Sequence, residues 1–524
     1  MNVVEDLRSA LGERLVVDLE TRERYSRDEA GFTGARPLAV SYPAEGDVEA
    51  LRRVFETCAR ARVKVLLASS REHVTGCTLS GDDGAVVVDF RDWRTCEVVS
   101  SVSKIGRVGA GVTLAKACET FRDRGFRLMV PHGVPPGASL LTTYLERYPL
   151  YSGVRVLRAE GWQAFMNLSV VLADGRELQT GSGEVTRGTG PGGGSSASFL
   201  PFGPAGPDLS RLFTGAQGSM GAVTSADIKL KRAPEATTVR FVAAGSIGEA
   251  VSAVTKAATL EVGECWVVLP RKAAAAAIAA FELVSRGDLK LPSGLSTEPR
   301  PGDPNVDTFA AIREARPLLD PLVEEVAGHL PNHLAVVALM AFDPKEIEID
   351  LEDLADLGIS AAASPFGDGD PCDSVGVDVG KSFGAEFVHP TGALLAPRVL
   401  SSPSEHVEVL PFYVSGNRSE ELDAMLSDTF EGAGSGQQFA ASLGFAIPIE
   451  FARVWYRELY LPSDDDELSA AVWSALLDFG VAVDQPRGRW AKQVFAQVPS
   501  YAALVKRVKR LLDPHGLLRN VVSE

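Results

Sequence analysis

The stretch that decides the fold runs from Gly206 to Thr224 and reads GPDLSRLFTGAQGSMGAVT. Three of its glycines, at positions 215, 218 and 221, lie three residues apart. Glycine has no β-carbon, so this spacing lets the backbone turn tightly and pass close to a flat or anionic ligand. Glycines at such spacing also serve simple turns between a helix and a strand, so the spacing alone leaves a ligand site and a structural turn both open.

Length and composition indicate a folded protein of several domains. The chain has 524 residues, of which 45% are hydrophobic and 23% charged. Single cores stop growing at about 250–300 residues, which predicts two or three domains. The net charge of -17 repels phosphate backbones and argues against nucleic acid as a partner.

Cysteine usage and the N-terminus indicate a location in the cell. The six cysteines are scattered, without a CxxC pair or a Cys/His cluster at metal-ligand spacing. We therefore expect free thiols in a reducing compartment and no metal site. The N-terminus carries the acidic residues Glu5 and Asp6 where a secretory signal would carry basic ones. The most apolar windows are shorter than the roughly 20 residues that span a bilayer. These features predict a cytoplasmic protein without a transmembrane segment.

Strand and helix patterns alternate in the first half of the chain. Asp47 is placed to cap a helix that runs through Cys58, between short β-branched runs. The expected strands are Val63–Leu67, Ala85–Phe90 and Ile105–Gly111, and a further helix is expected at Leu114–Arg124. This alternation predicts an α+β or α/β layout.

The pattern changes near Thr237, where a second domain is expected to begin. Its strands are predicted at Val239–Ala244, Cys265–Leu269 and Leu334–Phe342, between alanine-rich helices. The acidic run Asp464–Glu467 is typical of a helix start rather than of a metal site. An amphipathic helix is predicted at Tyr501–Leu512, followed by Asp-Pro-His-Gly.

The stretch Gly206–Thr224, with Ile228–Leu230 after it, resembles the phrase that closes the flavin domain of FAD-linked oxidases, the superfamily of vanillyl-alcohol oxidase and of the D-lactate and glycolate dehydrogenases. Further similar segments follow the family's order, at Arg24–Gly31, Pro37–Leu51, Val108–Cys118, Val170–Gly181 and Leu512–Leu518. The resemblance implies an α+β fold. Its parts would be a PCMH-type FAD-binding domain with two subdomains over residues 1–235, a cap or substrate domain with a large antiparallel sheet over 236–490, and a C-terminal helix at 491–524 that returns to the FAD domain.

The resemblance also implies which positions lie against FAD. The pyrophosphate loop would follow the strand at Val63–Leu67, and a second loop would follow the strand that leads into Pro131. The implied cofactor-binding residues are Ser69, Ser70, Arg71, Glu72, His73, Gly76, Pro131, Ser139, Thr142, Thr143, Ser152, Gly153, Gly215, Gly218, Gly221, Val223, Thr224 and Asn520.

Both loops depart from the family's pattern. Ser69, Ser70 and Arg71 stand where the family has glycines, and Glu72 places an anion beside the pyrophosphate. Strain and like-charge contacts each cost about 1–3 kcal/mol unless the loop reshapes. The Arg71 guanidinium and the two serine hydroxyls offer compensation. In the second loop, Thr142-Thr143 replaces a double glycine.

Some relatives attach the flavin covalently through a histidine in the first loop. The aligned position here is Glu72, so non-covalent FAD is expected, and His73 is read either as a surface histidine or as an attachment site. The double loss of glycine leaves two states open: a remodelled FAD site, or a chain that keeps the fold without flavin.

Catalytic residues are less well marked, because the HxGDGNxH signature of the lactate and glycolate branch is absent. His389 is a candidate base, with a structural histidine as the alternative. Tyr413 and Arg418 resemble a strand entering the active site, where arginine suits carboxylate recognition. Arg487 and Arg489, near Trp490, are a third choice. Each of these residue types also serves packing or surface roles.

The sequence thus predicts an FAD-dependent oxidoreductase that oxidises a small hydroxy acid or phenolic alcohol by hydride transfer to flavin N5, with oxygen or an electron-transfer subunit as acceptor. The alternative is a non-catalytic, flavin-free subunit that accompanies a sister flavoprotein. A third reading is a binding protein whose crevice holds another ligand.

Overall fold

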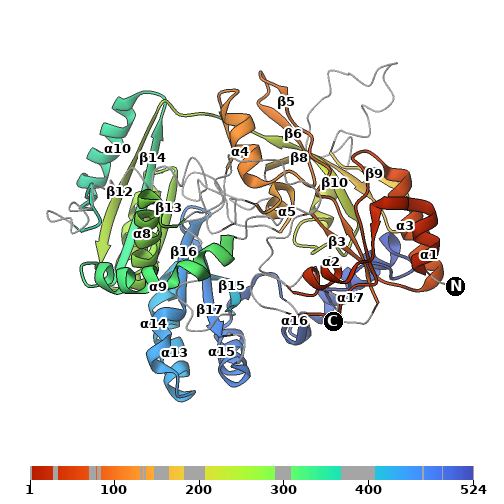
Figure 1. The fold of residues 1–524 in the computed structure, drawn as a ribbon. Helices are drawn as coiled ribbons and strands as arrows, with labels where there is room; N and C mark the ends of the chain where they lie inside the picture. Colours follow the sequence, from red (N-terminus) through yellow and green to blue (C-terminus); the bar gives the residue numbers. More distant parts are fainter. Residues whose placement is uncertain are drawn as a thin grey trace.

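The computed structural model describes residues 3–27, 33–69, 78–79, 84–129, 134, 137–146, 164–181, 207–289, 308–366, 407–462, 465–486 and 488–522. Two halves lie side by side, with the N-terminal elements at one end and the strands after residue 236 at the other (Figure 1). Mixed helices and sheets with a large antiparallel sheet confirm the predicted α+β class.

The first subdomain holds a four-stranded sheet in the order β1-β2-β4-β3. Strand β4 pairs in parallel with both β2 and β3, while β1 is antiparallel to β2. Asp47 caps α3 by accepting a hydrogen bond from the amide of Ala50, as predicted. The elements are α1 (Val3–Leu11), β1 (Leu15–Val16), α2 (Leu19–Arg24), β2 (Ala39–Ser41), α3 (Val48–Ala61), β3 (Val65–Ala68) and β4 (Val86–Asp89).

The second subdomain holds an antiparallel sheet of five strands in the order β5-β6-β10-β8-β9. Its strands are β5 (Cys96–Ser100), β6 (Ile105–Gly109), β8 (Phe165–Val171), β9 (Glu177–Gln179) and β10 (Ala222–Lys229). Helices α4 (Leu114–Arg122) and α5 (Leu140–Leu145) accompany it, and the short strands β7 (Phe126–Arg127) and β11 (Lys231–Arg232) pair beside it. The quoted stretch Gly206–Thr224 therefore leads through a 3-10 turn at Leu209–Leu212 into the central strand β10.

The other half is built on a seven-stranded antiparallel sheet in the order β12-β14-β13-β16-β17-β15-β18. The strands are β12 (Ala236–Ala244), β13 (Cys265–Pro270), β14 (His333–Ala341), β15 (Val407–Ser415), β16 (Leu443–Ile449), β17 (Val454–Pro462) and β18 (Ala482–Val483). The three predicted strands of this half are confirmed, with shifts of a few residues at their ends.

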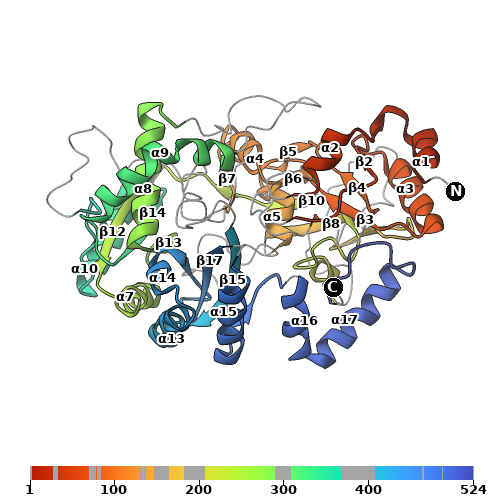
Figure 2. The ribbon, with the colours of Figure 1, turned by 60° about the horizontal axis from the view of Figure 1, so that its bottom comes forward.

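Helices cover this sheet, and two more lead back to the first half. The covering helices are α7 (Ile247–Thr259), α8 (Arg271–Arg286), α9 (Thr308–Ala327), α10 (Pro344–Asp356), α13 (Ser419–Gly432), α14 (Phe439–Ser442) and α15 (Asp466–Phe479). Asp465 caps α15, which confirms the helix start predicted for the acidic run. Helices α16 (Gly488–Ala496) and α17 (Pro499–Leu512) then return beneath the N-terminal sheet (Figure 2).

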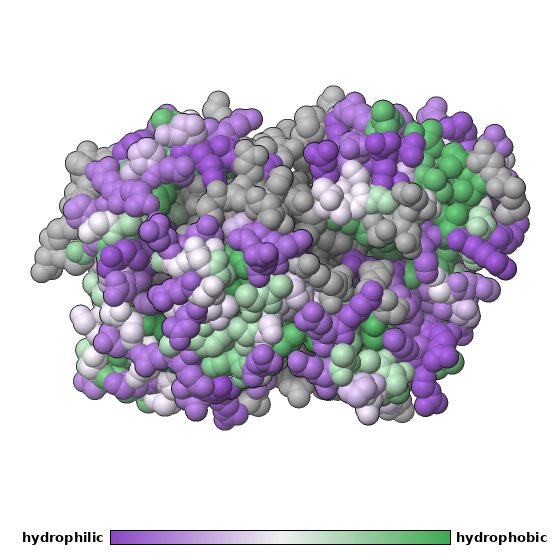
Figure 3. All heavy atoms as spheres, turned by 90° about the horizontal axis from the view of Figure 1, so that it is seen from below, coloured by the Kyte–Doolittle hydropathy of each residue, from purple (hydrophilic) through white to green (hydrophobic). Residues whose placement is uncertain are grey.

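The surface seen from below mixes hydrophilic and hydrophobic residues over both halves (Figure 3). Some apolar side chains of α17 face solvent, among them Leu504 and Leu511. Among the described residues, every helix is too short or too polar to cross a membrane.

Candidate cofactor site

A cavity of ≈ 80 Å³ lies in the first half of the molecule, where the end of β3, helix α5 and the loop before β10 meet. Five residues predicted from the sequence to bind the cofactor line it: Ser69, Thr142, Gly218, Gly221 and Val223. The remaining lining is mostly apolar, with a few polar side chains, and consists of Leu67, Ala68, Thr78, Phe90, Ala110, Leu141, Leu145, Glu146, Phe213, Ala216, Gln217 and Met220.

The glycines of the quoted stretch have separate roles. Gly215 and Gly218 have φ angles of +67° and +71°, which side-chain-bearing residues rarely adopt. At Gly221 a β-carbon would lie 2.9 Å from a methyl carbon of Val170 on β8. The loop is therefore shaped by glycine both for its turns and for its close packing on the sheet.

Helix α5 carries the second predicted loop to the cavity. The Ser139 hydroxyl accepts a hydrogen bond from the Thr142 amide at 3.2 Å and donates to the Ala110 carbonyl at 2.7 Å. The amide of Gly215 donates to the carbonyl of Leu145 at 2.7 Å, which ties the glycine loop to the same helix. Thr143 is buried and does not line the cavity, so the structure brings Thr142 to the site and not its neighbour.

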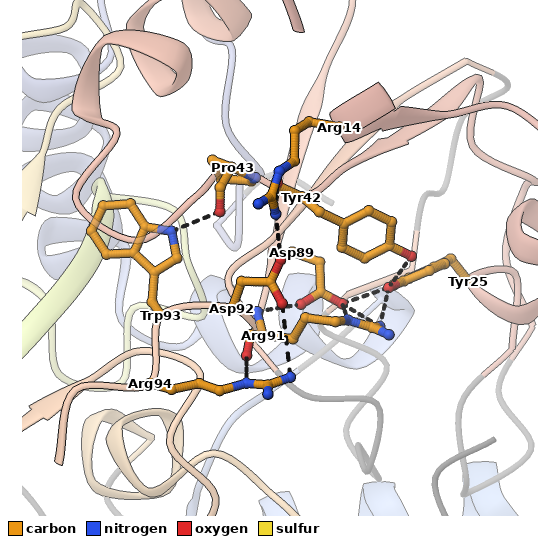
Figure 4. Close-up of polar contacts among 9 residues, drawn as sticks. All are labelled: Arg14, Tyr25, Tyr42, Pro43, Asp89, Arg91, Asp92, Trp93 and Arg94. Carbon is orange, nitrogen blue, oxygen red and sulfur yellow. Dashed lines mark hydrogen bonds and ion pairs between the residues drawn. The ribbon is translucent and has the colours of Figure 1, made fainter. Parts of the chain in front are cut away.

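A buried polar cluster fixes the end of β4 next to the cavity (Figure 4). The Asp89 carboxylate accepts hydrogen bonds from the Tyr25 hydroxyl and from the Arg91 guanidinium. Burial opposes its charge, but Arg91 and Tyr25 outweigh burial and lower the pKa of Asp89. The next residue, Phe90, lines the cavity, and its amide donates to the Ala68 carbonyl at 2.8 Å.

The C-terminal segment joins the same sheet. The amide of Val65 donates to the Leu517 carbonyl at 3.0 Å, and Leu518 forms a parallel bridge with Val65. The Asp513 carboxylate fixes this segment by accepting from the amides of Leu517 and Leu518. Asn520 therefore follows a segment that runs beside β3. It does not line the cavity.

Two glutamines that sequence reasoning missed connect this cavity to the other half. The side-chain amide of Gln217 donates to the Pro486 carbonyl at 3.4 Å, and that of Gln485 donates to the Glu146 carbonyl at 2.7 Å. Both glutamines are buried and have positive φ angles, +49° and +44°. Gln217 lies inside the quoted stretch Gly206–Thr224, and its position in that stretch was the one signal in the sequence that could have identified it as a site residue.

Tyr413 lies on β15 of the seven-stranded sheet, close to this connection. Its hydroxyl lies 3.5 Å from a carboxylate oxygen of Asp484, the residue before Gln485. On the neighbouring strand β17, the buried carboxylate of Glu458 accepts from the hydroxyls of Tyr456 and Tyr460, at 2.7 and 3.1 Å. Tyr413 was predicted from the sequence, but Asp484 and the group on β17 were not, because residues on different elements share no local pattern that would link them to Tyr413.

Arg418 is not brought to this group. Its guanidinium forms an ion pair with Glu421 at 3.0 Å and lies over the Phe479 ring, at the turn that leads into α13. Thr224 donates to the Ser169 carbonyl within the five-stranded sheet and does not line the cavity. The other predicted site residues lie outside the described residues: Ser70, Arg71, Glu72, His73, Gly76, Pro131, Ser152, Gly153, His389 and Arg487.

The cavity's residues fit a flat cofactor with polar groups. The glycine loop presents backbone without β-carbons, and the Ser69 and Thr142 hydroxyls offer donors. The side-chain oxygen of Gln217 is buried and has no donor within the described part of the chain. An unpaired buried acceptor costs about 1–3 kcal/mol, which a hydrogen-bond donor on a bound ligand would recover.

Comparison with known proteins assigns this region. Residues 37–145, which include β3, β4 and α5, match the family described as "FAD binding domain". The probable mitochondrial D-lactate dehydrogenase of Danio rerio is 28% identical over 261 residues, which cover 48% of this chain and 47% of that protein. The chain thus spans about half the length of this relative in the match.

Two solved structures share the fold over nearly the whole chain. A 4-ethylphenol oxidase from Gulosibacter chungangensis, in complex with isoeugenol, aligns with a TM-score of 0.71 at 15% identity, over 99% of this chain and 95% of its own. A p-cresol methylhydroxylase with bound substrate aligns with a TM-score of 0.67 at 16% identity, over 98% and 95%.

These findings define a flavoprotein with an FAD-binding domain, and FAD is the cofactor of that domain. The FAD binding domain and the shared fold agree with the resemblance of the closing phrase before β10 to the FAD-linked oxidases.

Proposed function

We propose that the protein is an FAD-dependent oxidoreductase that oxidises a small hydroxy acid or a phenolic alcohol. One observation carries the proposal: the cavity that lies within the FAD-binding domain is tied, through Gln485, to the segment that bears Asp484 opposite Tyr413. Cofactor site and proton-accepting group are thus held by one continuous set of contacts.

The comparisons support both substrate classes. The relative from Danio rerio is described as a probable D-lactate dehydrogenase. The two solved structures are described as a p-cresol methylhydroxylase and a 4-ethylphenol oxidase. All of these compounds carry a hydroxyl group whose proton is lost as hydride leaves: in a 2-hydroxy acid it is on the oxidised carbon, and in a 4-alkylphenol it is conjugated with the oxidised benzylic carbon across the ring.

When bound, FAD would accept the hydride at N5. The chain's own residues would bind the substrate and manage its proton. Tyr413 would contact the substrate hydroxyl, and the proton would pass to the Asp484 carboxylate 3.5 Å away. Glu458, held by two tyrosine hydroxyls, would keep the neighbouring strand face polar. His389 and Arg487 remain further candidates for this site.

The first experiment asks whether the protein holds and uses flavin. Purified protein, incubated with FAD and desalted, should keep a yellow flavin that denaturation releases. Under anaerobic conditions, a panel of small 2-hydroxy acids and 4-alkylphenols is then added, and at least one class should bleach the flavin. Protein that stays colourless after FAD treatment would reject the proposal in favour of a flavin-free subunit.

Tyr413→Phe tests the proposed proton path. The variant keeps the aromatic ring but removes the hydroxyl, so flavin content should be unchanged. General acid–base groups contribute roughly 10²–10⁴-fold to rate. We expect anaerobic flavin reduction by the active substrate to slow by about 10²-fold, the low end of that range. An unchanged reduction rate would exclude Tyr413 from proton transfer.

A further inference from the structure

Two hydroxyl groups from the two loops that depart from the family's glycine pattern meet at the cavity. The Ser69 oxygen lies 2.6 Å from the Thr142 side-chain oxygen, although 73 residues separate them in the chain. Ser69 directly follows β3, and Thr142 lies in the first turn of α5. Both residues line the cavity, and Ser69 is only 8% exposed.

The hydrogen atoms of this pair can be counted. Each hydroxyl carries one hydrogen and can also accept. The bond between them uses one hydrogen, and neither hydroxyl has another acceptor among the residues that the structure describes. Within the described part of the chain, one O–H donor of the pair is therefore left over at the cavity wall.

Both hydroxyls are held in place by their surroundings. Ala68, next to Ser69, pairs with Asp89 of β4, which the Tyr25–Arg91 cluster fixes. The Thr142 amide is already used, because it donates to Ser139. The backbone at this position thus has no free donor, and its hydrogen-bonding capacity toward the cavity comes from the side chain.

We propose that the Ser69–Thr142 hydroxyl pair donates one hydrogen bond to a pyrophosphate oxygen of FAD, in place of backbone amides of glycine loops. The inference rests on the proposed function, since it requires FAD in this cavity. Hydrogen bonds to charged groups contribute more than neutral ones, which suits an anionic acceptor at a single remaining donor.

The pair makes a specific prediction about redundancy. If one hydroxyl is removed, the other no longer spends its hydrogen on its partner and can donate to the phosphate itself. Ser69→Ala or Thr142→Val alone should therefore weaken FAD binding less than about threefold, a cost below 1 kcal/mol. The double variant has neither of the two hydroxyl donors. Its FAD dissociation constant should rise at least about tenfold, which is more than the two single-variant increases multiplied together.

The measurement is a titration of apoprotein with FAD, followed by quenching of flavin fluorescence. ADP, which carries a diphosphate without a flavin, serves as a competing probe, and its inhibition constant should rise by a similar factor in the double variant. Thr142→Ser in the Ser69→Ala background keeps one hydroxyl and should bind like the single variants. Ser41→Ala removes a buried hydroxyl from β2 of the same sheet, away from the cavity, and controls for a general effect on folding.

The outcomes separate this inference from the proposed function. If the wild type binds FAD and the folded double variant binds it equally well, the inference is wrong and the function stands. Additive single effects would also overturn the shared-donor arrangement. If the wild type binds neither FAD nor ADP, the proposed function fails and the inference with it.

Discussion

Gln217 combines two features that a residue with a purely structural role rarely shows. Its φ angle of +49° is unfavourable for a residue with a side chain, and its buried side-chain oxygen finds no donor within the described ranges. Strain of this kind persists where the surrounding structure enforces it, and it gathers at ligand sites. Because Gln217 lines the cavity, we expect its oxygen to accept a hydrogen bond from the cofactor.

Gln217→Gly separates the two features. Glycine adopts the positive φ without strain, and this gain offsets the loss of the 3.4 Å hydrogen bond to the Pro486 carbonyl, so the free energy of unfolding of the apoprotein should change by less than about 1 kcal/mol. FAD affinity should fall about fivefold or more, because one hydrogen bond is lost. Urea unfolding of the apoprotein and an FAD titration measure the two quantities. A large loss of apoprotein stability with unchanged affinity would assign Gln217 a structural role instead.

At the scale of single elements, the end of β4 depends on Tyr25. Tyr25 belongs to the segment Arg24–Gly31, one of the segments that resemble the FAD-linked oxidases. Its hydroxyl donates to the buried Asp89 carboxylate, and Arg91 neutralises the charge. The cluster therefore stabilises the strand whose next residue, Phe90, forms part of the cavity wall.

Tyr25→Phe should lower the free energy of unfolding by about 1.5–3 kcal/mol, the usual range for a hydrogen bond to a charged group. The lowered pKa of Asp89 means that its carboxylate stabilises the fold above pH about 4 and that this stabilisation is lost as the pH falls. The variant should thus differ less from wild type in acid than at neutral pH. Urea unfolding at both pH values tests this.

The control for Tyr25→Phe is Tyr42→Phe. The Tyr42 hydroxyl contacts that of Tyr25 at 3.2 Å, and its ring lies under the Arg91 guanidinium, a contact that phenylalanine keeps. A loss of stability as large as that of Tyr25→Phe would show that the bond to Asp89 is not the main contribution.

The predicted elements were those with strong local patterns. Asp47 before an amphipathic run and the acidic run before Asp466 each marked a helix start, because a cap acts on amides two or three residues away. The contact between Tyr413 and Asp484 crosses 71 residues, and that between Ser69 and Thr142 crosses 73. Pairs at such distances are brought together by sheet topology, which no local spacing in the sequence encodes.

At the scale of the whole molecule, the two halves are joined by a buried group of charges. The Glu264 carboxylate, just before β13, accepts from Arg127 of β7 at 2.6 Å and from Lys231 of β11 at 2.7 Å. The acid comes from the half with the seven-stranded sheet, and both bases come from the half that contains the FAD binding domain. This contact therefore fixes how the two halves meet, and with it the position of Tyr413 relative to the cavity.

Glu264 should make the joined structure sensitive to acid. Burial by itself would raise the pKa of Glu264, but Arg127 and Lys231 outweigh it and lower the pKa to about 2. A lowered pKa means that the stabilisation is complete above the ordinary value of 4.5 and is lost as the pH falls toward 2. Glu264→Gln should cost about 3–5 kcal/mol at neutral pH, because it leaves the buried Arg127 without its partner charge.

A neighbouring surface pair provides the comparison. Arg232 and Glu235 form an ion pair at 2.9 Å, and both side chains are well exposed to solvent. Exposed pairs contribute about 0–1 kcal/mol, so Glu235→Gln should change the free energy of unfolding little at any pH. Denaturant unfolding of both variants and wild type at pH 7 and pH 3 completes the test. The difference between wild type and Glu264→Gln should be smaller at pH 3, since the unfolded chain then binds a proton at Glu264 while the folded protein does not, and this offsets part of the stabilisation by the ion pair. A difference of equal size at both pH values would mean that Glu264 acts through packing, and that its charge does not hold the two halves together.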